Sequence, residues 1–269
     1  MRPKPPTSWK KLLANPGRDG HVVQLYRDED FCGEAVAHFA AEGLAADDSI
    51  ILVATQPRWE NVARRLESRG FNLAALFRRH QLTVLDAALT LPKFMTGSLP
   101  DARTFKGLAR KTIEKARAGG KYAGVRWWGE MVNVLYVAGN KRGSHRLEQL
   151  FDEVAHEQSI AIFCSFRMDQ YDPRIYEEDF GNVCRTHSHL IAAENDLSHK
   201  AAVNRAIREV IGEIKGPLFR SLALWTGTPC LMSSSQALLF WIKGTLPMHF
   251  EEVMKRVRAY DEAREGVAA

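Results

Sequence analysis

The stretch HVVQLYRDEDFCGEAVAHF, His21–Phe39, decides the fold. It begins with the apolar run VVQL, which predicts a short buried strand. It continues with Phe31, Ala35 and Phe39, whose spacing is that of one face of a helix. A strand is therefore expected to pass into a helix through the turn Tyr26–Asp28.

This turn differs from the phosphate-binding turn that many nucleotide-binding proteins carry at the same place. A phosphate loop needs glycines so that backbone N–H groups surround the phosphates, together with a Lys and a Ser or Thr. Here Asp28, Glu29 and Asp30 stand where the helix should begin, and Arg27 is the only cation beside them. A triphosphate would meet negative charge, which favours sensing over hydrolysis.

Two interpretations of the acidic turn stay open. In one, Asp28 and its neighbours cap an ordinary helix, because carboxylates at a helix start accept hydrogen bonds from free N–H groups and complement the helix dipole. In the other, the turn is part of a remodelled ligand pocket.

Composition sets the class of protein. The 269 residues are 45% hydrophobic, which allows a sizeable core. The net charge is +5, but the basic residues are mixed with acids, so direct nucleic-acid binding is not favoured. The four cysteines are widely spread and form no CxxC pair. We expect a cytoplasmic protein with reduced thiols, no export signal and no membrane span.

Short apolar strands alternate with amphipathic helices along the next part of the chain. Strands are expected at Ser49–Thr55, Leu82–Ala87, Val125–Trp128 and Ile160–Phe166, and helices at Arg58–Arg69, Asp101–Ala118 and Ser144–Glu157. This order predicts an α/β fold with a mostly parallel sheet covered by helices on both faces. We expect residues 1–19 to form an N-terminal arm and residues 20–191 to form this domain.

Five segments of this region together resemble the MEDS family, a sensory domain named from methanogens, methylotrophs and a dichloromethane-responsive regulator. They are HVVQLYRDEDF, EGLAADDSIILVAT, LTVLDA, GVRWWGEM and CRTHSHL. The resemblance implies a RecA-like fold that lacks the phosphate loop and serves as a small-molecule sensor in signalling proteins. It implies no defined set of ligand-binding residues, and no helix-turn-helix precedes the domain in this sequence.

Candidate binding residues follow from strand position, because ligands of open parallel sheets bind beyond the carboxyl ends of the strands. Those ends offer a mixture of aromatic, amide and charged groups, which suits a pocket with an apolar floor and a few orienting polar atoms. Thr55, Ser165 and Arg167 also stand at strand ends. The residues that we predict to bind a ligand are Tyr26, Arg27, Phe31, Gln56, Asp86, Trp128 and Glu130.

Glu130, in the motif WWGEM, has two interpretations. It can occupy the place of a carboxylate that binds magnesium or activates water in an ATPase. Alternatively, it opens the helix that contains Val132–Val137, where an acid in the first turn is favourable.

A second group of interest is Cys184, His187 and His189, with His199 further along the chain. Thiolate and imidazole are good zinc ligands. However, no second cluster of Cys and His accompanies them, so we predict no metal ligand and favour hydrogen bonds from these histidines to backbone carbonyls. No nucleophile elbow is present, and the serines at 144 and 233–235 indicate helix starts.

Residues 197–269 are expected to form an all-helical region for docking or dimerisation. A stripe of apolar residues in 203–214 predicts one helix, and others are expected at Leu218–Trp225, in SSSQALLFWIKG and at Met248–Arg264. Such helices either pack on the preceding domain or offer an apolar surface to a second copy or partner.

Three functions remain in order of preference. The first is a non-enzymatic cytoplasmic sensor without a cofactor, which binds a small organic molecule and signals to a regulatory protein, for example in transcription, or to a second subunit. The second is a divergent nucleotide-binding protein or ATPase that uses Glu130 and Arg27. The third is a metal-dependent hydrolase centred on His187 and His189.

Overall fold

A parallel sheet forms the centre of the structure. The computed structural model describes residues 8–177, 179–212 and 230–268. In these residues the main sheet has six strands in the order β3-β2-β6-β7-β1-β8, and all neighbouring strands are parallel. The strands are β1 (His21–Tyr26), β2 (Ser49–Ala54), β3 (Leu82–Asp86), β6 (Val125–Gly129), β7 (Ala161–Arg167) and β8 (His189–Ile191). A small antiparallel pair joins β4 (Met95–Thr96) to β5 (Leu99–Pro100).

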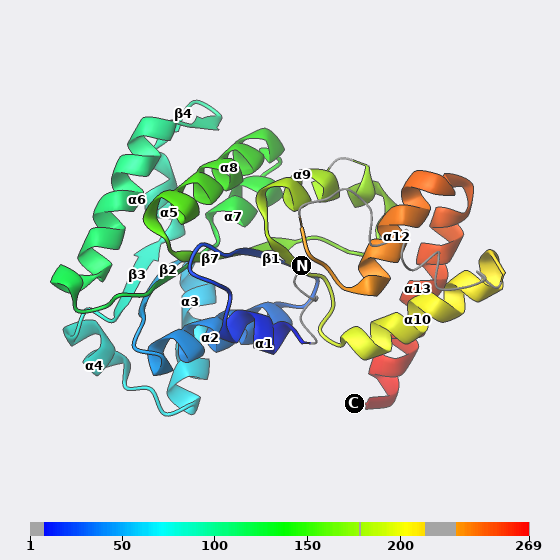
Figure 1. Ribbon diagram of the computed structural model, residues 1–269, viewed down its shortest axis with the longest axis horizontal. Helices are drawn as coiled ribbons and strands as arrows, with labels where there is room; N and C mark the ends of the chain where they lie inside the picture. The colour runs from blue at the N-terminus through cyan, green and yellow to red at the C-terminus, as the bar shows by residue number, and fades with distance from the viewer. Residues whose placement is uncertain (1–7, 178, 213–229, 269) are drawn as a thin grey trace.

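Helices cover both faces of the sheet, as the alternation of strands and helices predicts (Figure 1). On one face lie α1 (Trp9–Ala14), α2 (Glu29–Ala45), α3 (Gln56–Ser68) and α4 (Leu73–Arg78). On the other lie α5 (Ala87–Thr90), α6 (Ala102–Ala116), α7 (Met131–Val137), α8 (Lys141–Gln158) and α9 (Asp179–Thr186). Successive strand residues supply the two cores alternately: Val22 belongs to the α2 side and Val23 to the α8 side.

The β1–α2 turn has the capped geometry that its acids allow. Asp28 is the N-cap of α2, and its side chain accepts a hydrogen bond from the Asp30 N–H over 2.9 Å. Glu29 and Asp30 occupy the first turn, where negative charge complements the helix dipole. The first turn of α2 thus carries carboxylates at the end where a phosphate-binding protein presents free N–H groups.

The expected N-terminal arm contains a helix that packs against the domain. Trp9 and Leu13 of α1 are buried against α2. The guanidinium of Arg126 donates to the carbonyls of Leu13 and Ala14 over 2.9 and 3.1 Å and pairs with Asp48 over 2.7 Å. This buried cation therefore satisfies carbonyl groups at the C-terminal end of α1.

The C-terminal helices share a core with the sheet. They are α10 (Asp196–Val210), α12 (Ser234–Thr245) and α13 (Pro247–Ala268), grouped on the right of Figure 1. Ala206, Leu239 and Val257 belong to the same apolar cluster as β1 and β7. The helix expected at Leu218–Trp225 lies outside the described residues. Among the helices that are described, none is both long enough and apolar enough to cross a membrane.

Candidate ligand-binding site

A cavity of about 670 Å³ opens where β1, β2, β6 and β7 end. Its position follows from the topology. The helix after β2, α3, covers one face of the sheet, whereas the helix after the adjacent β6, α7, covers the other. The two connections separate there and leave a crevice, which is the usual ligand position in open α/β sheets. We call it the carboxyl-end cavity.

A buried ion-pair network forms one wall of this cavity. Arg58, on the first turn of α3, is 7% exposed, and Glu130, directly after β6, is 6% exposed. The Arg58 Nε lies 3.4 Å from Oε1 of Glu130, and its Nη2 also pairs with the Glu29 carboxylate. The other Glu130 oxygen accepts two hydrogen bonds from Thr55, one from its N–H and one from its hydroxyl, each over 2.8 Å. Glu130 is therefore held in place by groups from β2 and α3.

Tyr26, the last residue of β1, contributes a hydroxyl to the same wall. Its oxygen accepts hydrogen bonds from Arg58 Nη2 over 3.1 Å and from Asn133 Nδ2 over 3.3 Å. The Asn133 amide is oriented because its oxygen accepts from the Arg167 N–H over 2.8 Å. Burial raises the pKa of Tyr26 above its ordinary value, so the hydroxyl keeps its proton. Arg58 and Asn133 both donate to the hydroxyl oxygen, so the hydroxyl proton is available to an acceptor other than these two residues.

The cavity also has an apolar lining. It is formed by Pro57 of α3 and by Val134, Val137 and Ala138 from α7 and its end. Val137 is 60% exposed, so its side chain stands in solvent at the cavity mouth. An apolar lining with a few fixed polar groups is the usual composition of a small-molecule site, and the volume lies in the usual range.

Of the predicted ligand-binding residues, Tyr26 and Glu130 line the carboxyl-end cavity. Arg27 and Phe31 line a neighbouring cavity of about 320 Å³, which also includes Tyr26. Three others have different positions. Gln56 is exposed and bonds to Glu60 over 2.9 Å, Asp86 caps α5 through the Leu89 N–H, and the buried Trp128 indole donates to Ser165 Oγ over 3.1 Å.

Arg58 and Asn133 are cavity residues that strand position does not predict, because both lie on helices. One signal was available for Arg58. The first turn of a helix favours acids, so a cation there needs an acidic partner that offsets its unfavourable interaction with the helix dipole. For Asn133 no signal in the sequence separates it from other helical amides.

The position of Glu130 agrees with the helix-opening interpretation, whereas nothing in its contacts tests the ATPase interpretation. It is the N-cap residue of α7, as the helix-opening interpretation requires. Its side chain, however, makes no cap hydrogen bond and points to Thr55 and Arg58 instead. The carboxylate therefore forms part of the cavity wall and does not cap its own helix.

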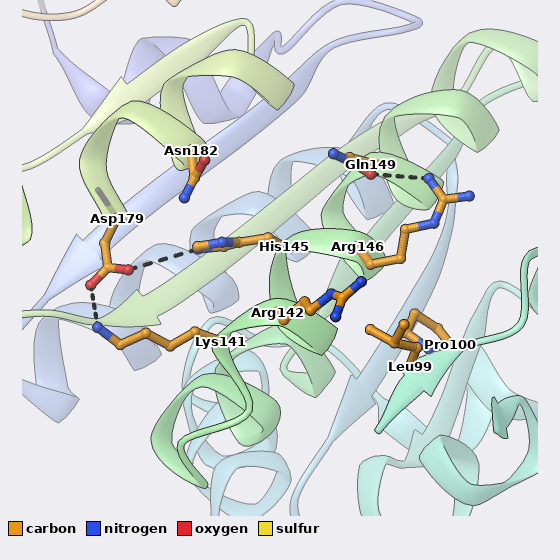
Figure 2. Close-up of a pocket in the computed structure, with 9 residues that line it drawn as sticks. All are labelled: Leu99, Pro100, Lys141, Arg142, His145, Arg146, Gln149, Asp179 and Asn182. Atoms are coloured by element: carbon orange, nitrogen blue, oxygen red, sulfur yellow. Dashed lines mark hydrogen bonds and ion pairs between the residues drawn. The ribbon is translucent and has the colours of Figure 1, made fainter. Parts of the chain in front are cut away.

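A further cavity, of about 630 Å³, lies over the start of α8 (Figure 2). It is lined by Lys141, Arg142, His145 and Arg146, and by Asp179 of α9. Lys141 Nζ lies 2.8 Å and His145 Nε2 lies 3.9 Å from the Asp179 carboxylate. Burial lowers the pKa of His145, which keeps the ring neutral at ordinary pH. This cavity stands away from the strand ends, and none of the predicted binding residues lines it.

The cysteine and histidines near residue 187 do not gather into one site. His189 Nδ1 lies 3.0 Å from Ser188 Oγ, and His199 Nδ1 lies 2.7 Å from Oδ2 of Asp261 on α13. His187 Nδ1 bonds to the Val183 carbonyl over 2.7 Å, which is the contact that we predicted for such histidines. Its other nitrogen faces Glu148.

Comparison with known proteins supports the resemblance found in the sequence. The family model of the MEthanogen/methylotroph, DcmR Sensory domain (MEDS) matches residues 20–188. That range includes β1, all four strand ends around the carboxyl-end cavity, and α9. No curated protein gives a significant match to the chain.

Proposed function

The chain belongs to the MEDS family of sensory domains, and on that basis we propose that it is a cytoplasmic sensor that binds a small organic molecule in the carboxyl-end cavity. The molecule is bound without being chemically changed. The single observation that carries this proposal is the cavity wall made by Tyr26, Arg58 and Glu130, in a cavity that apolar residues also line.

The charges of the cavity favour a ligand of modest polarity. Arg58 is compensated by Glu29 and Glu130, and Arg167 Nε lies 3.9 Å from Glu29. The positive and negative groups thus compensate one another and leave no strong field for a multiply charged ligand. The Tyr26 proton provides a donor for a hydroxyl, carbonyl or halogen group on a molecule whose apolar part contacts Val134 and Val137.

A route for signal transfer begins next to the cavity. Arg27 follows Tyr26 and reaches Glu262 of α13 over 3.0 Å, while its guanidinium lies 4.8 Å from the Tyr171 ring centre. The Tyr171 hydroxyl in turn donates to Asp261 over 2.8 Å. A ligand that shifts the turn after β1 would therefore change the contacts that hold α13, and so the surface offered to a regulatory protein or second subunit.

The second candidate function is divergent nucleotide binding. The observation in its favour is the fixed carboxylate of Glu130 at the end of β6, beside a cavity large enough for a nucleotide. Against it stand Asp28, Glu29 and Asp30 at the start of α2. A native mass spectrum with magnesium-ATP separates the two: a stoichiometric nucleotide adduct that Glu130→Ala abolishes would replace the sensor proposal with this one.

The test of the sensor proposal is a thermal-shift assay with a panel of small halogenated, hydroxylated and carboxylated organic compounds. We expect at least one compound to raise the melting temperature of the wild-type chain. Val137→Trp places an indole at the cavity mouth and should abolish this shift. Leu89→Trp, another exposed apolar position outside the cavity, is the matched control and should keep it.

The proposal is overturned if no compound stabilises the chain, or if Val137→Trp and Leu89→Trp respond alike. The second result would place the binding site elsewhere on the molecule.

A further inference from the structure

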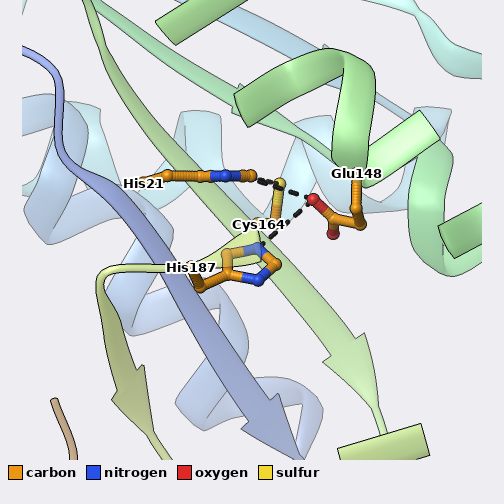
Figure 3. A group of neighbouring side chains, drawn as sticks. All are labelled: His21, Glu148, Cys164 and His187. Carbon is orange, nitrogen blue, oxygen red and sulfur yellow. Dashed lines mark hydrogen bonds and ion pairs between the residues drawn. The ribbon is translucent and has the colours of Figure 1, made fainter. Parts of the chain in front are cut away.

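A buried cluster of four potential metal ligands lies on the α8 face of the sheet, at the opposite end of β1 from the carboxyl-end cavity (Figure 3). His21 is the first residue of β1, Cys164 lies within β7, Glu148 belongs to α8, and His187 lies between α9 and β8. All four are buried, and their ligand atoms lie within 4.8 Å of one another. None of the cavities described above is lined by any of them.

A hydrogen bond of His187 turns the lone pair of its other ring nitrogen toward the centre of the cluster. His187 Nδ1 lies 2.7 Å from the Val183 carbonyl, which only accepts, so this nitrogen carries the proton. Its Nε2 therefore presents a lone pair to Glu148 Oε2, 3.2 Å away. His21 Nε2 also faces the centre, 3.2 Å from Glu148 Oε2 and 3.4 Å from Cys164 Sγ, while its Nδ1 lies 3.5 Å from the Asp152 carboxylate.

Several of these buried atoms have no hydrogen bond within the described part of the chain. They are Nδ1 of His21, Nε2 of His187 and both carboxylate oxygens of Glu148. A buried carboxylate facing an imidazole lone pair is costly unless something positive stands between them. Only a proton or a small cation fits in that space.

Three of the six separations between the ligand atoms are close to those of a zinc centre, and all six are within 4.8 Å. Zinc binds imidazole nitrogen, carboxylate oxygen and thiolate sulfur at roughly 2.0–2.3 Å, so the ligand atoms of a tetrahedral site lie roughly 3.3–3.8 Å apart. The three contacts of 3.2, 3.2 and 3.4 Å lie at or just below the short end of this range. The outer contacts also fit, because zinc-bound histidines donate their second N–H to a carboxylate or a backbone carbonyl. The Val183 carbonyl takes this role for His187, and the Asp152 carboxylate lies 3.5 Å from His21 Nδ1.

Charge balance also favours a divalent cation at the centre of the cluster. The carboxylate of Glu148 and the thiolate of Cys164 together neutralise a divalent cation, while both imidazoles bind in the neutral form. The buried centre would then carry no net charge. The competing occupant is a proton between His21 Nε2 and Glu148 Oε2, which lie 3.2 Å apart. A single proton there leaves His187 Nε2 without a donor.

We propose that His21, Glu148, Cys164 and His187 form a structural zinc site that ties β1 and β7 to α8 and to the α9–β8 connection. The site is closed, since its four ligands fill a tetrahedral shell and none is exposed. It differs from the cluster weighed in the sequence: of those residues only His187 takes part, because its three partners come from other parts of the chain.

The test uses the purified full-length chain, incubated with zinc and dialysed, with metal content measured by plasma mass spectrometry. We expect one zinc per chain, and a melting temperature that falls with a chelator and recovers when zinc is added, because a metal that binds only the folded state stabilises it. Cys164→Ala should weaken zinc binding more than about tenfold, in line with the loss of a ligand. Cys32→Ala removes another buried thiol outside the cluster and should bind zinc as the wild type does.

Cobalt replacement gives a second readout that needs no variant. The wild-type chain loaded with Co²⁺ should show the intense visible bands of tetrahedral cobalt together with thiolate-to-cobalt charge transfer. The proposal is overturned if the zinc-treated chain retains no metal and ignores the chelator. It is also overturned if Cys164→Ala binds zinc as tightly as Cys32→Ala, or if bound cobalt lacks the thiolate band.

Discussion

Arg58 is the residue on which the charge balance of the carboxyl-end cavity depends. It compensates Glu130, which is buried, and Glu29, which is half exposed to solvent. A buried charge that loses its partner costs far more than an exposed one, because the remaining ion cannot be solvated. The cavity wall can therefore keep its polar groups only while this guanidinium is present.

The first prediction concerns this residue. Arg58→Met, which keeps an unbranched stem but removes the guanidinium, should lower the free energy of unfolding by about 3 kcal/mol, the typical cost of leaving a buried carboxylate unpaired. Urea unfolding at neutral pH measures it. Arg65→Met on the same helix is the control: Arg65 pairs with Asp30 and Glu34 near the surface, so its loss should cost less than about 1 kcal/mol. Equal losses in the two variants would mean that Arg58 does not hold a buried charge.

At the scale of single residues, the strand-end rule predicted part of the site from the sequence. Tyr26 and Glu130 directly follow or end apolar strands, so their place at the cavity could be foreseen. Gln56 and Asp86 obey the same rule but turn to local partners, because a side chain near a helix start can bond within its own turn. Whether a strand-end residue lines the cavity or bonds within its own turn depends on neighbours that are brought close only in the folded chain.

At the scale of elements, the sequence predicts the β1–α2 unit well because its signals are local. The apolar run VVQL, the cap at Asp28 and the helical spacing after it all lie within one short stretch. The docking of α1 depends on Arg126 of β6, which is more than a hundred residues away. The four residues of the zinc cluster likewise come from four separate segments, so their spacing in the sequence gives no signal.

The contact between α10 and α13 gives a prediction about acid stability. Glu209 of α10 accepts hydrogen bonds from the Tyr260 hydroxyl, from Arg205 over 3.0 Å and from Arg256 over 2.9 Å. These bonds lower the pKa of Glu209 from 4.5 to about 2. As the pH falls, the unfolded chain takes up this proton first, so the stabilisation is complete above about pH 4.5 and is lost toward pH 2.

Glu209→Gln removes the titrating group and should flatten this part of the profile. Unfolding midpoints in urea, measured from pH 6 to pH 2, should fall less steeply below about pH 4.5 in the variant than in the wild type. Parallel profiles would show that the contact between α10 and α13 does not depend on this carboxylate.

At the scale of the whole molecule, the cavity and the proposed metal site lie toward different ends of one sheet. The carboxyl ends of the strands hold a cavity with a neutralised polar wall, and the α8 face toward the other end holds the proposed zinc site. The metal would fix the start of β1 and the middle of β7, while the turns after the same strands remain free to respond to a ligand. Those turns contact α13 through Arg27 and Tyr171.

Coupling between the cavity and α13 is the central claim, and hydrogen exchange of the full chain tests it most directly. The exchange rates are compared with and without the compound that gives the largest thermal shift. The account predicts slower or faster exchange both in the turns after β1 and β7 and in residues 247–262, because ligand binding must shift the population of the contacts that hold α13. Changes confined to the cavity, with residues 247–262 unaltered at saturating ligand, would contradict it.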